Sequence, residues 1–107
     1  MHSKNIRNFR RRNPETEILY SIRGVLISLG FTVLRVPPSI YSSQKGWPDL
    51  LAIKNGSVYF IEVKTERGRQ SADQKRFQEI VENAGCKYFV LHSAKEAFEI
   101  FGGGRDV

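Results

Sequence analysis

Hydrophobic residues recur at helical spacing in the first part of the chain and predict a helix over residues 14–29. Asn13 is a favourable N-cap residue, and Pro14 suits the first helical position because its ring presets the backbone. Gly30 is typical of the end of a helix. The apolar positions of this helix are Ile18, Leu19, Ile22, Val25, Leu26 and Leu29.

Four shorter segments are rich in β-branched and aromatic residues and therefore predict strands. They span residues 31–36 (FTVLRV), 49–53 (DLLAI), 58–65 (VYFIEVKT) and 87–92 (KYFVLH). Asn55 and Gly56 separate the second strand from the third, and this dipeptide is typical of a two-residue type I′ hairpin turn. We expect the first three strands to form an antiparallel meander.

Capping residues followed by apolar positions predict two further helices. The capping boxes are Ser71 with Gln74, before a helix over residues 72–84, and Ser93 with Glu96, before a helix over residues 94–101. The helix between the third and fourth strands makes these two strands parallel neighbours. The fold class is therefore α/β, with a mixed sheet of about four strands flanked by helices in the order αβββαβα.

The length of 107 residues is that of one domain, and 40% hydrophobic residues are enough for a single core. No apolar run approaches the roughly 18 residues of a membrane-spanning helix, and the first residues lack the apolar stretch of a signal peptide. The single cysteine, Cys86, excludes an internal disulfide, and we expect it to be a small core residue. These features predict a reduced, cytoplasmic protein that is neither secreted nor bound in a membrane.

The net charge of +6 is concentrated at the start of the chain. The basic residues that precede the first acidic residue are Lys4, Arg7, Arg10, Arg11 and Arg12. Such a segment favours polyanions, usually nucleic acid, because binding releases counterions. Residues 1–12 are predicted to be a disordered basic arm and residues 102–107 a flexible tail; the alternative for the arm is a terminus that only aids solubility.

The third predicted strand combines core-type residues with charges. Strand alternation puts Phe60, Glu62 and Lys64 on one face. A buried charge is costly unless it is paired or binds a metal, so packing alone would favour apolar residues at these positions. The alternative is a Glu62–Lys64 pair on a face of the sheet that is open to solvent.

Asp49 adds a second carboxylate to this picture. If the strands pair across the Asn55–Gly56 turn, Asp49 and Glu62 converge at the open end of the hairpin. Two carboxylates without cysteine or paired histidine suit Mg²⁺ or Mn²⁺ rather than zinc. Lys64 could orient a water and offset charge on a phosphate, so the three residues are the minimum for metal-assisted phosphodiester hydrolysis.

Three segments together resemble the VRR-NUC domain, a branch of the PD-(D/E)XK nuclease superfamily. They are residues 46–50 (GWPDL), 60–64 (FIEVK) and 68–74 (GRQSADQ), and the resemblance extends over roughly residues 14–100. It implies a restriction-endonuclease-like fold and a nuclease domain at residues 13–101. The small stand-alone members are similar in size and layout to archaeal Holliday junction resolvases.

The resemblance also implies roles for the central residues. Asp49, Glu62 and the backbone carbonyl of Val63 would bind the metal, and Lys64 would be the catalytic lysine. The implied cofactor is Mg²⁺ or Mn²⁺, and the implied products carry 5′-phosphates.

Two further site residues follow from the same resemblance. The family carries a glutamate in the first helix, in a pattern resembling Glu-x-x-Ile-Gln; Glu15 matches it as a catalytic acid and metal ligand, although Leu19 replaces the glutamine. Glu17 is the alternative, and both acids could simply complement the helix dipole. Gln74 is expected to reach the active site from the start of its helix, a role compatible with capping.

Basic residues near these motifs are expected to bind the DNA backbone together with the arm. They are Lys45, Arg67, Arg69, Lys75 and Arg76. A solvated charged face is the alternative for this group.

The sequence therefore predicts a DNA endonuclease that depends on Mg²⁺ or Mn²⁺ and has no small-molecule substrate. Because no added recognition module is visible, cleavage selective for branched DNA is favoured over base-specific cleavage, with four-way (Holliday) junctions as the leading candidate. Two alternatives stay open. One is a nuclease subunit that cuts flaps or single strands with a helicase or terminase partner, and the other is a nucleic-acid-binding module that does not cleave.

We expect a two-fold symmetric homodimer, because a symmetric junction presents two equivalent strands for cleavage. Two apolar groups are poorly placed for the predicted core. They are Ile40 with Tyr41 in the loop after the first strand, and Phe98, Ile100 and Phe101 near the C-terminus. Either group could form the interface, and we favour the loop because it adjoins the active-site strand. The alternative is that Tyr41 packs locally and that the last helix covers the edge of the sheet.

Overall fold

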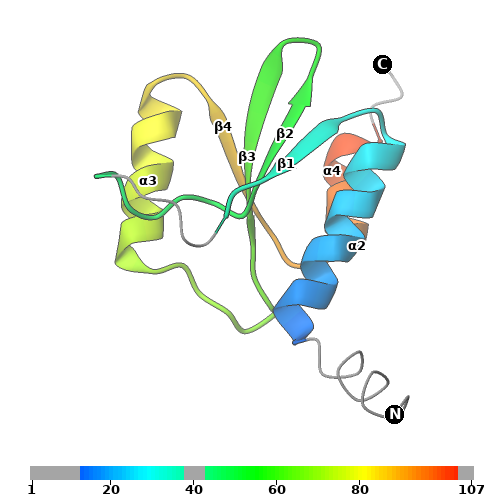
Figure 1. Cartoon of the computed structure of the whole chain (residues 1–107), viewed down its shortest axis with the longest axis horizontal. Helices are drawn as coiled ribbons and strands as arrows, with labels where there is room; N and C mark the ends of the chain where they lie inside the picture. The colour runs from blue at the N-terminus through cyan, green and yellow to red at the C-terminus, as the bar shows by residue number, and fades with distance from the viewer. Residues whose placement is uncertain (1–12, 38–42, 104–107) are drawn as a thin grey trace.

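A four-stranded mixed sheet lies at the centre of the computed structural model, which describes residues 13–37 and 43–103 (Figure 1). Its strands are β1 (Thr32–Arg35), β2 (Leu50–Lys54), β3 (Ser57–Val63) and β4 (Lys87–Leu91). Their order in the sheet is β1-β2-β3-β4; β1 and β2 are antiparallel, β2 and β3 are antiparallel, and β3 and β4 are parallel. The predicted meander and the predicted parallel pair are confirmed, with slightly different strand ends.

Within the described residues, three helices cover the two faces of this sheet: α2 (Pro14–Ser28), α3 (Ala72–Asn83) and α4 (Ala94–Phe101). The helices α2 and α4 pack against each other on one face, and α3 lies on the opposite face (Figure 1). This arrangement confirms the α/β class and the element order αβββαβα. No helix within the described residues is long and apolar enough to cross a membrane.

Side-chain caps begin the first two helices as predicted. Asn13 Oδ1 accepts a hydrogen bond from Thr16 N at 2.8 Å. At the start of α3, Ser71 Oγ accepts from Gln74 N at 3.1 Å, and Gln74 Oε1 accepts from Ser71 N at 2.8 Å. These bonds satisfy backbone donors that a helix leaves without partners in its first turn.

The capping box predicted for α4 is only half correct. Ser93 Oγ accepts from Glu96 N at 3.1 Å, as expected. The Glu96 carboxylate, however, accepts from His92 N at 2.6 Å rather than from Ser93 N, and its oxygen also lies 3.2 Å from His92 Nδ1. Because His92 offers both a backbone and a ring nitrogen, it replaces the cap residue as the partner of Glu96.

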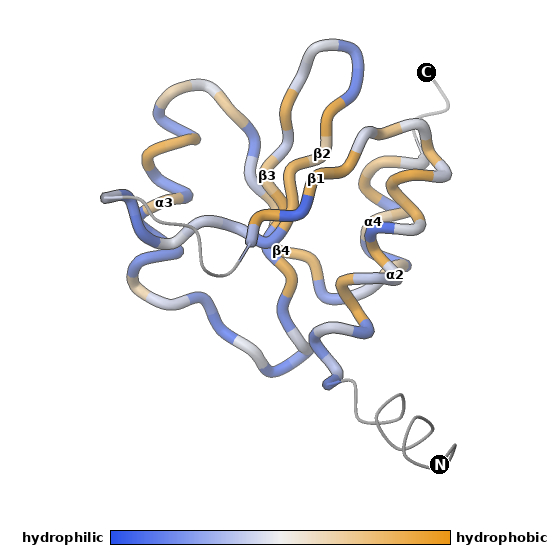
Figure 2. Tube along the Cα trace, in the orientation of Figure 1, coloured by the Kyte–Doolittle hydropathy of each residue, from blue (hydrophilic) through white to orange (hydrophobic). Residues whose placement is uncertain are grey.

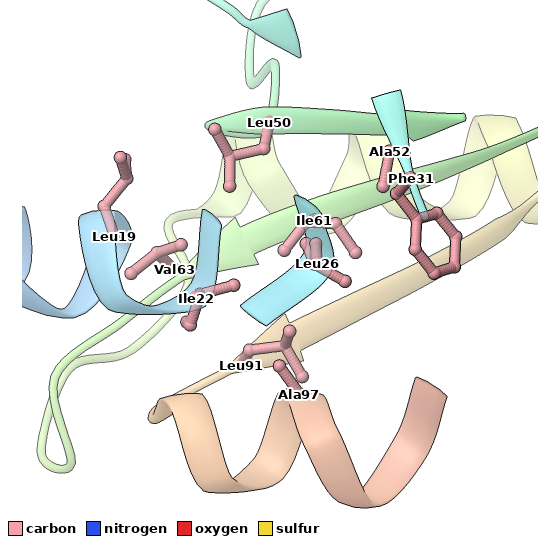
Figure 3. Close-up of a cluster of buried hydrophobic side chains, with 10 residues drawn as sticks. All are labelled: Leu19, Ile22, Leu26, Phe31, Leu50, Ala52, Ile61, Val63, Leu91 and Ala97. Carbon is pink, nitrogen blue, oxygen red and sulfur yellow. The ribbon is translucent and has the colours of Figure 1, made fainter. Parts of the chain in front are cut away.

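The main hydrophobic core lies between the sheet and the helices α2 and α4 (Figure 3). Alternate residues of β2 and β3 point into this core, as strand geometry requires. Its buried members are Leu19, Ile22, Leu26, Phe31, Leu50, Ala52, Ile61, Val63, Leu91 and Ala97. Figure 2 shows hydrophobic positions on the strands and on α2 and α4, whereas the connection from β3 to α3 is mostly hydrophilic.

Phe101 belongs to the edge of this core, which corrects the prediction that it is poorly placed for core packing. Its ring packs edge-on against Phe31 and Tyr59, with centroid distances of 5.3 and 5.6 Å. The α-helical turn of α4 directs Phe101 to the sheet while Phe98 and Ile100 remain exposed. The other predicted apolar pair, Ile40 and Tyr41, lies outside the described residues.

Cys86 is exposed, so the prediction that it is a core residue is wrong. It lies in the short connection of residues 84–86 between the end of α3 and the first residue of β4. The residue therefore belongs to a surface connection and not to the paired part of the strand.

Aromatic residues fill the layer between the sheet and α3. The ring of Phe77, on α3, lies 4.8 Å from Trp47, 5.8 Å from Phe60 and 6.5 Å from Tyr88, measured between centroids. Phe60 and Tyr88 are cross-strand partners and share this face of the sheet. Glu62, two residues after Phe60, points into the same layer, as alternation predicts.

Candidate active site

The hairpin formed by β2 and β3 places Asp49 opposite Glu62. Leu50 pairs with Ile61 at the end of the ladder, and Asp49 N donates to the Ile61 carbonyl at 3.1 Å. The next residues outward are therefore Asp49 on one side and Glu62 on the other. At the closed end, Asn55 and Gly56 have φ values of 52° and 81°, as a type I′ turn requires. The predicted convergence of the two carboxylates is confirmed in position.

Asp49 is fixed at this point by the backbone on both sides. Its Oδ2 accepts a hydrogen bond from Val63 N at 2.7 Å, and its carbonyl accepts from Val36 N at 2.9 Å. The first bond ties the carboxylate of Asp49 to the strand that carries Glu62. Lys64 comes directly after the last residue of β3, and its backbone N donates to the Leu91 carbonyl at 3.0 Å.

Glu62 is the only buried charged residue among those that the structure describes, with 1% of its surface exposed. Its Oε2 accepts a hydrogen bond from Gln74 Nε2 at 2.7 Å and lies 3.5 Å from Lys64 Nζ. Its Oε1 accepts from the Tyr88 hydroxyl at 3.1 Å. Glu62 is therefore an ion-pair partner of Lys64 in a buried layer, and the predicted alternative of a solvent-facing pair is wrong.

Gln74 performs both of the roles that its sequence position indicates. Its side-chain oxygen closes the capping box with Ser71 N, while its amide nitrogen donates to Glu62. A single side chain thus links the first turn of α3 to the carboxylate on β3. The position of the helix and the orientation of Glu62 depend on each other through this residue.

The electrostatic environment of the two carboxylates opposes their ionisation. Burial, followed by the negative charge of Asp49, raises the pKa of Glu62 from 4.5 to about 7, although Lys64 and the Tyr88 hydrogen bond lower it. Burial also raises the pKa of Asp49, while the Val63 hydrogen bond and the charge of Lys64 lower it. The positive charges of Lys64 and, near Asp49, of Arg35 lower these pKa values but do not offset the effect of burial.

This donor set fits a hard divalent cation. Asp49 and Glu62 offer carboxylate oxygens on adjoining strand ends, and their mutual repulsion is the kind that a bound cation relieves. Mg²⁺ is commonly held by one or two carboxylates while it keeps several waters. The backbone carbonyl of Val63, between Glu62 and Lys64 in the chain, is the third oxygen that the sequence resemblance implies.

A cavity of about 120 Å³ brings Glu15, Arg35 and Asp49 together beside the first turn of α2. Asn13, Thr16 and Leu19 complete its lining. Glu17 is exposed and does not line this cavity, so Glu15 is the helix acid that lies on the side of Asp49. In residues 13–37 and 43–103, no three acidic, histidine or cysteine side chains form a group able to bind one metal ion.

Gly46 and Trp47 attach the segment before Asp49 to helix α3. Gly46 has a φ of 87°, and a Cβ atom at this position would overlap the backbone of Asp73 and approach Gln74 N at 2.9 Å. The Trp47 ring packs on Phe77, as described above, which makes packing its observed role. Only glycine allows this close approach, and it seats the segment leading to Asp49 against the helix turn that carries Gln74.

Known proteins resemble this chain in both sequence and fold. A scan against protein families matches residues 15–89 to the archaeal Holliday junction resolvase (Hjc) family. The chain belongs to this family. It is also similar to a solved structure named "VRR_NUC domain", with 25% sequence identity, a TM-score of 0.74, and coverage of 87% of this chain and 99% of that chain. A comparison with curated proteins found no match.

Both results agree with the resemblance inferred from the sequence. The Hjc match includes Glu15, Asp49, Glu62, Lys64 and Gln74. The solved VRR_NUC domain is covered almost completely, so the two folds correspond over most of this chain. Membership in the Hjc family places this chain among the nucleases.

The predicted DNA-binding residues of this Hjc-family chain are spread over several surface positions. Lys45, Arg67, Arg69, Lys75 and Arg76 belong to the loop before Asp49, to the connection from β3 to α3 and to the first turns of α3. Lys45 and Arg76 line a common cavity of about 240 Å³ with Asp73. The arm residues Lys4, Arg7, Arg10, Arg11 and Arg12 lie outside the described residues.

Two residues that the sequence did not single out lie beside the site. Tyr88 donates to Glu62 from β4, and Arg35 shares a cavity with Asp49 at the end of β1. The sequence signal for Arg35 is its place at the end of a strand that pairs with the Asp49 strand. Tyr88 has a weaker signal, because only the register of β4 against β3 brings its hydroxyl to Glu62.

Proposed function

We propose that this Hjc-family chain is a divalent-metal-dependent endodeoxyribonuclease that cuts branched DNA, with four-way junctions as its substrate. Family membership and the likeness to a VRR_NUC domain support a nuclease that acts on branched DNA. The observation that carries the proposal is the meeting of Asp49, Glu62 and Lys64 at the open end of the β2–β3 hairpin. Two carboxylates beside a lysine are suited to metal-assisted hydrolysis of a phosphodiester.

The chemistry divides between the cation and the side chains around it. When bound, Mg²⁺ or Mn²⁺ would polarise the scissile phosphate and stabilise the departing 3′ oxygen. Asp49, Glu62 and the Val63 carbonyl would hold the cation. Lys64 Nζ, with its side chain 15% exposed, is placed to orient the attacking water and to offset negative charge that develops on the phosphate. Attack at phosphorus with loss of the 3′ oxygen leaves a 5′-phosphate on the product.

Two charged residues of the cavity beside Asp49 extend this arrangement. Glu15 lines the cavity beside Asp49 and would be the helix acid of the site, where the sequence resemblance implies a further metal ligand. Arg35 supplies a positive charge next to Asp49 and would contact a DNA phosphate at the mouth of the cavity. Gln74 would keep Glu62 in place from the start of α3.

The basic arm, residues 1–12, would add phosphate contacts away from the chemistry, together with Lys45, Arg67, Arg69, Lys75 and Arg76. If about five phosphates are contacted by the arm, its deletion lowers the slope of log affinity against log salt by roughly 0.9 for each contact. The expected result is weaker DNA binding with little change in cleavage of bound DNA. An unchanged salt slope would show that the arm does not contact DNA.

We also propose a two-fold homodimer, so that two equivalent active sites face the two equivalent strands of a junction. On the described surface, Phe98 and Ile100 of α4 are exposed apolar residues available for an interface, with 55% and 47% of their surface accessible. Light scattering at micromolar concentration should give about twice the chain mass of 12.3 kDa. A monomer that still makes paired incisions would contradict the dimer.

Cleavage of four DNA forms tests the proposal directly. Labelled four-way junction, flap, duplex and single-stranded DNA are incubated with the full chain in Mg²⁺, in Mn²⁺ and in EDTA, with Asp49→Asn as the matched inactive control. We expect paired, metal-dependent incisions in the junction and much less cutting of the duplex. Preference for flaps or single strands would instead favour a nuclease subunit working with a helicase or terminase. Binding of all four forms without any cleavage would favour a non-cleaving module.

A further inference from the structure

Tyr88 is in direct contact with a candidate metal ligand, yet neither the sequence motifs nor the proposed mechanism uses it. It lies on β4 and is buried, with 6% of its surface exposed. The parallel register pairs it with Phe60, and its side chain extends along the sheet to the next position on that face, which is Glu62. Its hydroxyl donates to Glu62 Oε1 at 3.1 Å.

The two oxygens of Glu62 have different partners. Gln74 Nε2 and Lys64 Nζ both approach Oε2, at 2.7 and 3.5 Å. Among the described residues, the Tyr88 hydroxyl is the hydrogen-bond donor on Oε1. One donor on each oxygen determines the plane of the carboxylate group, whereas donors on Oε2 alone would leave it free to turn about its last bond, which has a broad torsional preference.

We propose that Tyr88 is a positioning residue that, together with Gln74, holds the Glu62 carboxylate in the orientation that binds the divalent cation. Each carboxylate oxygen has two lone-pair directions, so a hydrogen bond from Tyr88 leaves Oε1 able to coordinate an ion as well. Hydrogen bonds to ligating carboxylates orient the ligand, and their loss commonly lowers metal affinity or activity by about 10- to 100-fold. This role rests on the proposed metal-dependent nuclease function.

The surroundings of Tyr88 suit this function better than simple space filling. Its ring lies 6.5 Å from the Phe77 ring of α3, so the same helix that carries Gln74 also packs against the ring. Tyr88 and Gln74 therefore approach Glu62 from β4 and from α3, respectively. Phenylalanine would fill almost the same space, so the distinct contribution of tyrosine is the hydroxyl that donates to Glu62.

Replacement of the hydroxyl alone tests this role, with a matched control on the other face of the sheet. Tyr88→Phe removes the donor to Glu62, and Tyr59→Phe removes a hydroxyl from a ring that packs against Phe31 in the α2/α4 core. Binding of Mn²⁺ to the full chain without DNA is followed by the loss of the free-ion electron paramagnetic resonance signal. Glu62→Gln gives the baseline for binding that does not involve the carboxylate.

We expect Tyr88→Phe to bind Mn²⁺ about tenfold more weakly than the wild type and to need correspondingly more Mg²⁺ for half-maximal cleavage, with junction affinity unchanged. Tyr59→Phe should match the wild type in all three measurements. Mn²⁺ affinity of Tyr88→Phe within twofold of the wild type would overturn the positioning role. Because this binding is measured without DNA, a chain that binds Mn²⁺ through Glu62 but cuts no DNA would contradict the proposed function alone.

A second measurement does not depend on how well the variant folds. In a crystal structure of the wild-type chain with Mn²⁺, the Tyr88 hydroxyl should stay within hydrogen-bond distance of Glu62 Oε1 while Glu62 contacts the ion. A Tyr88 hydroxyl that leaves Glu62 when the ion binds would overturn the positioning role, as would an ion that does not contact Glu62.

Discussion

Ile61 and Glu62 are neighbours on β3, and both are almost fully buried, yet they enter layers of opposite character. Ile61 lies in the core under α2 and α4, whose buried members are all hydrophobic (Figure 3). Glu62 enters the layer under α3, where an amide, a phenol and an ammonium surround its carboxylate. The first layer stabilises the fold by removing apolar surface from water. The second layer buries a carboxylate, whose ionised form is unfavourable away from water.

On β3, one face therefore carries residues that stabilise the fold, and the other face carries residues of the candidate active site. Burial and the nearby charge of Asp49 raise the pKa of Glu62, so the ionised form is unfavourable in the folded chain without a cation. Binding and catalytic sites commonly destabilise the folded state locally in this way, and the stability of the rest of the fold compensates. Substitutions on the two faces of β3 should therefore have opposite consequences for folding and for cleavage.

The largest effect is expected from the three central residues of the site. Asp49→Asn, Glu62→Gln and Lys64→Ala should each lower junction cleavage by at least about 10²-fold, because each removes a metal ligand or a stabilising charge. Single-turnover cleavage with enzyme in excess over a labelled junction measures this loss. Each variant should keep the wild-type circular dichroism spectrum. Near-normal turnover in any of them would remove that residue from the mechanism.

Glu62→Gln should at the same time leave the fold intact or stabilise it above neutral pH. The amide can turn its oxygen to Gln74 and Lys64 and its nitrogen to the Tyr88 hydroxyl, which can accept. The raised pKa of Glu62, about 7 against 4.5, means that the folded chain holds a proton that the unfolded chain releases between these values. The stabilising contribution of this proton is complete below pH 4.5 and is lost as the pH rises to about 7.

Urea unfolding of the metal-free wild type and of Glu62→Gln at pH 5 and pH 8 measures this contribution. The wild type should lose about 2.5 kcal/mol more unfolding free energy over this interval than the variant, because its Glu62 pKa changes from about 7 in the folded chain to 4.5 in the unfolded chain. Mg²⁺ should restore stability to the wild type at pH 8, because it binds the ionised carboxylates. Equal pH dependence in the two chains would mean that Glu62 is not forced toward its neutral form.

Much of this arrangement could be predicted because its determinants are local. The Asn55–Gly56 turn sets the register of β2 and β3, and that register alone puts Asp49 across from Glu62. Gln74 is predictable because one capping pattern and one family motif share its position. The element order follows in the same way from caps and periodicity, and it is confirmed.

The residues that escape prediction depend on contacts between distant segments. Tyr88 reaches Glu62 only through the parallel pairing of β4 with β3, which has no turn to set its register. The packing of Phe101 is missed because nothing near it in the sequence shows that α4 lies beside α2. Burial is the expectation for Cys86 because a free cysteine is commonly buried. It is exposed because it lies in the surface connection between α3 and β4.

A smaller loss of stability and cleavage is expected from changes at Gly46, where the loop before Asp49 contacts the start of α3. Gly46→Ala and Gly85→Ala both replace glycines with positive φ, 87° and 95°. A methyl group at Gly85 would have no atom within 4 Å, so this variant should lose only the roughly 1–2 kcal/mol of an unfavourable backbone conformation. Gly46→Ala also overlaps the backbone of Asp73, so it should unfold at lower urea concentration and cut junctions more slowly. Equal losses in both would mean that the contact with α3 is dispensable.

The smallest effect should come from the apolar side of the same strand. Ile61→Val removes one methylene-sized group from a fully buried position and should lower the free energy of unfolding by about 1 kcal/mol. The cleavage rate of the folded chain should not change, because Glu62 and its partners lie on the other face of β3 and their contacts do not involve the Ile61 side chain. Urea unfolding and single-turnover cleavage of Ile61→Val are measured in parallel with Glu62→Gln. Ile61→Val should lose unfolding free energy but keep its cleavage rate, whereas Glu62→Gln should lose cleavage but keep its stability. If Ile61→Val slowed cleavage about tenfold at full folding, the two layers would be coupled through the strand, and their division into a folding face and a chemical face would be wrong.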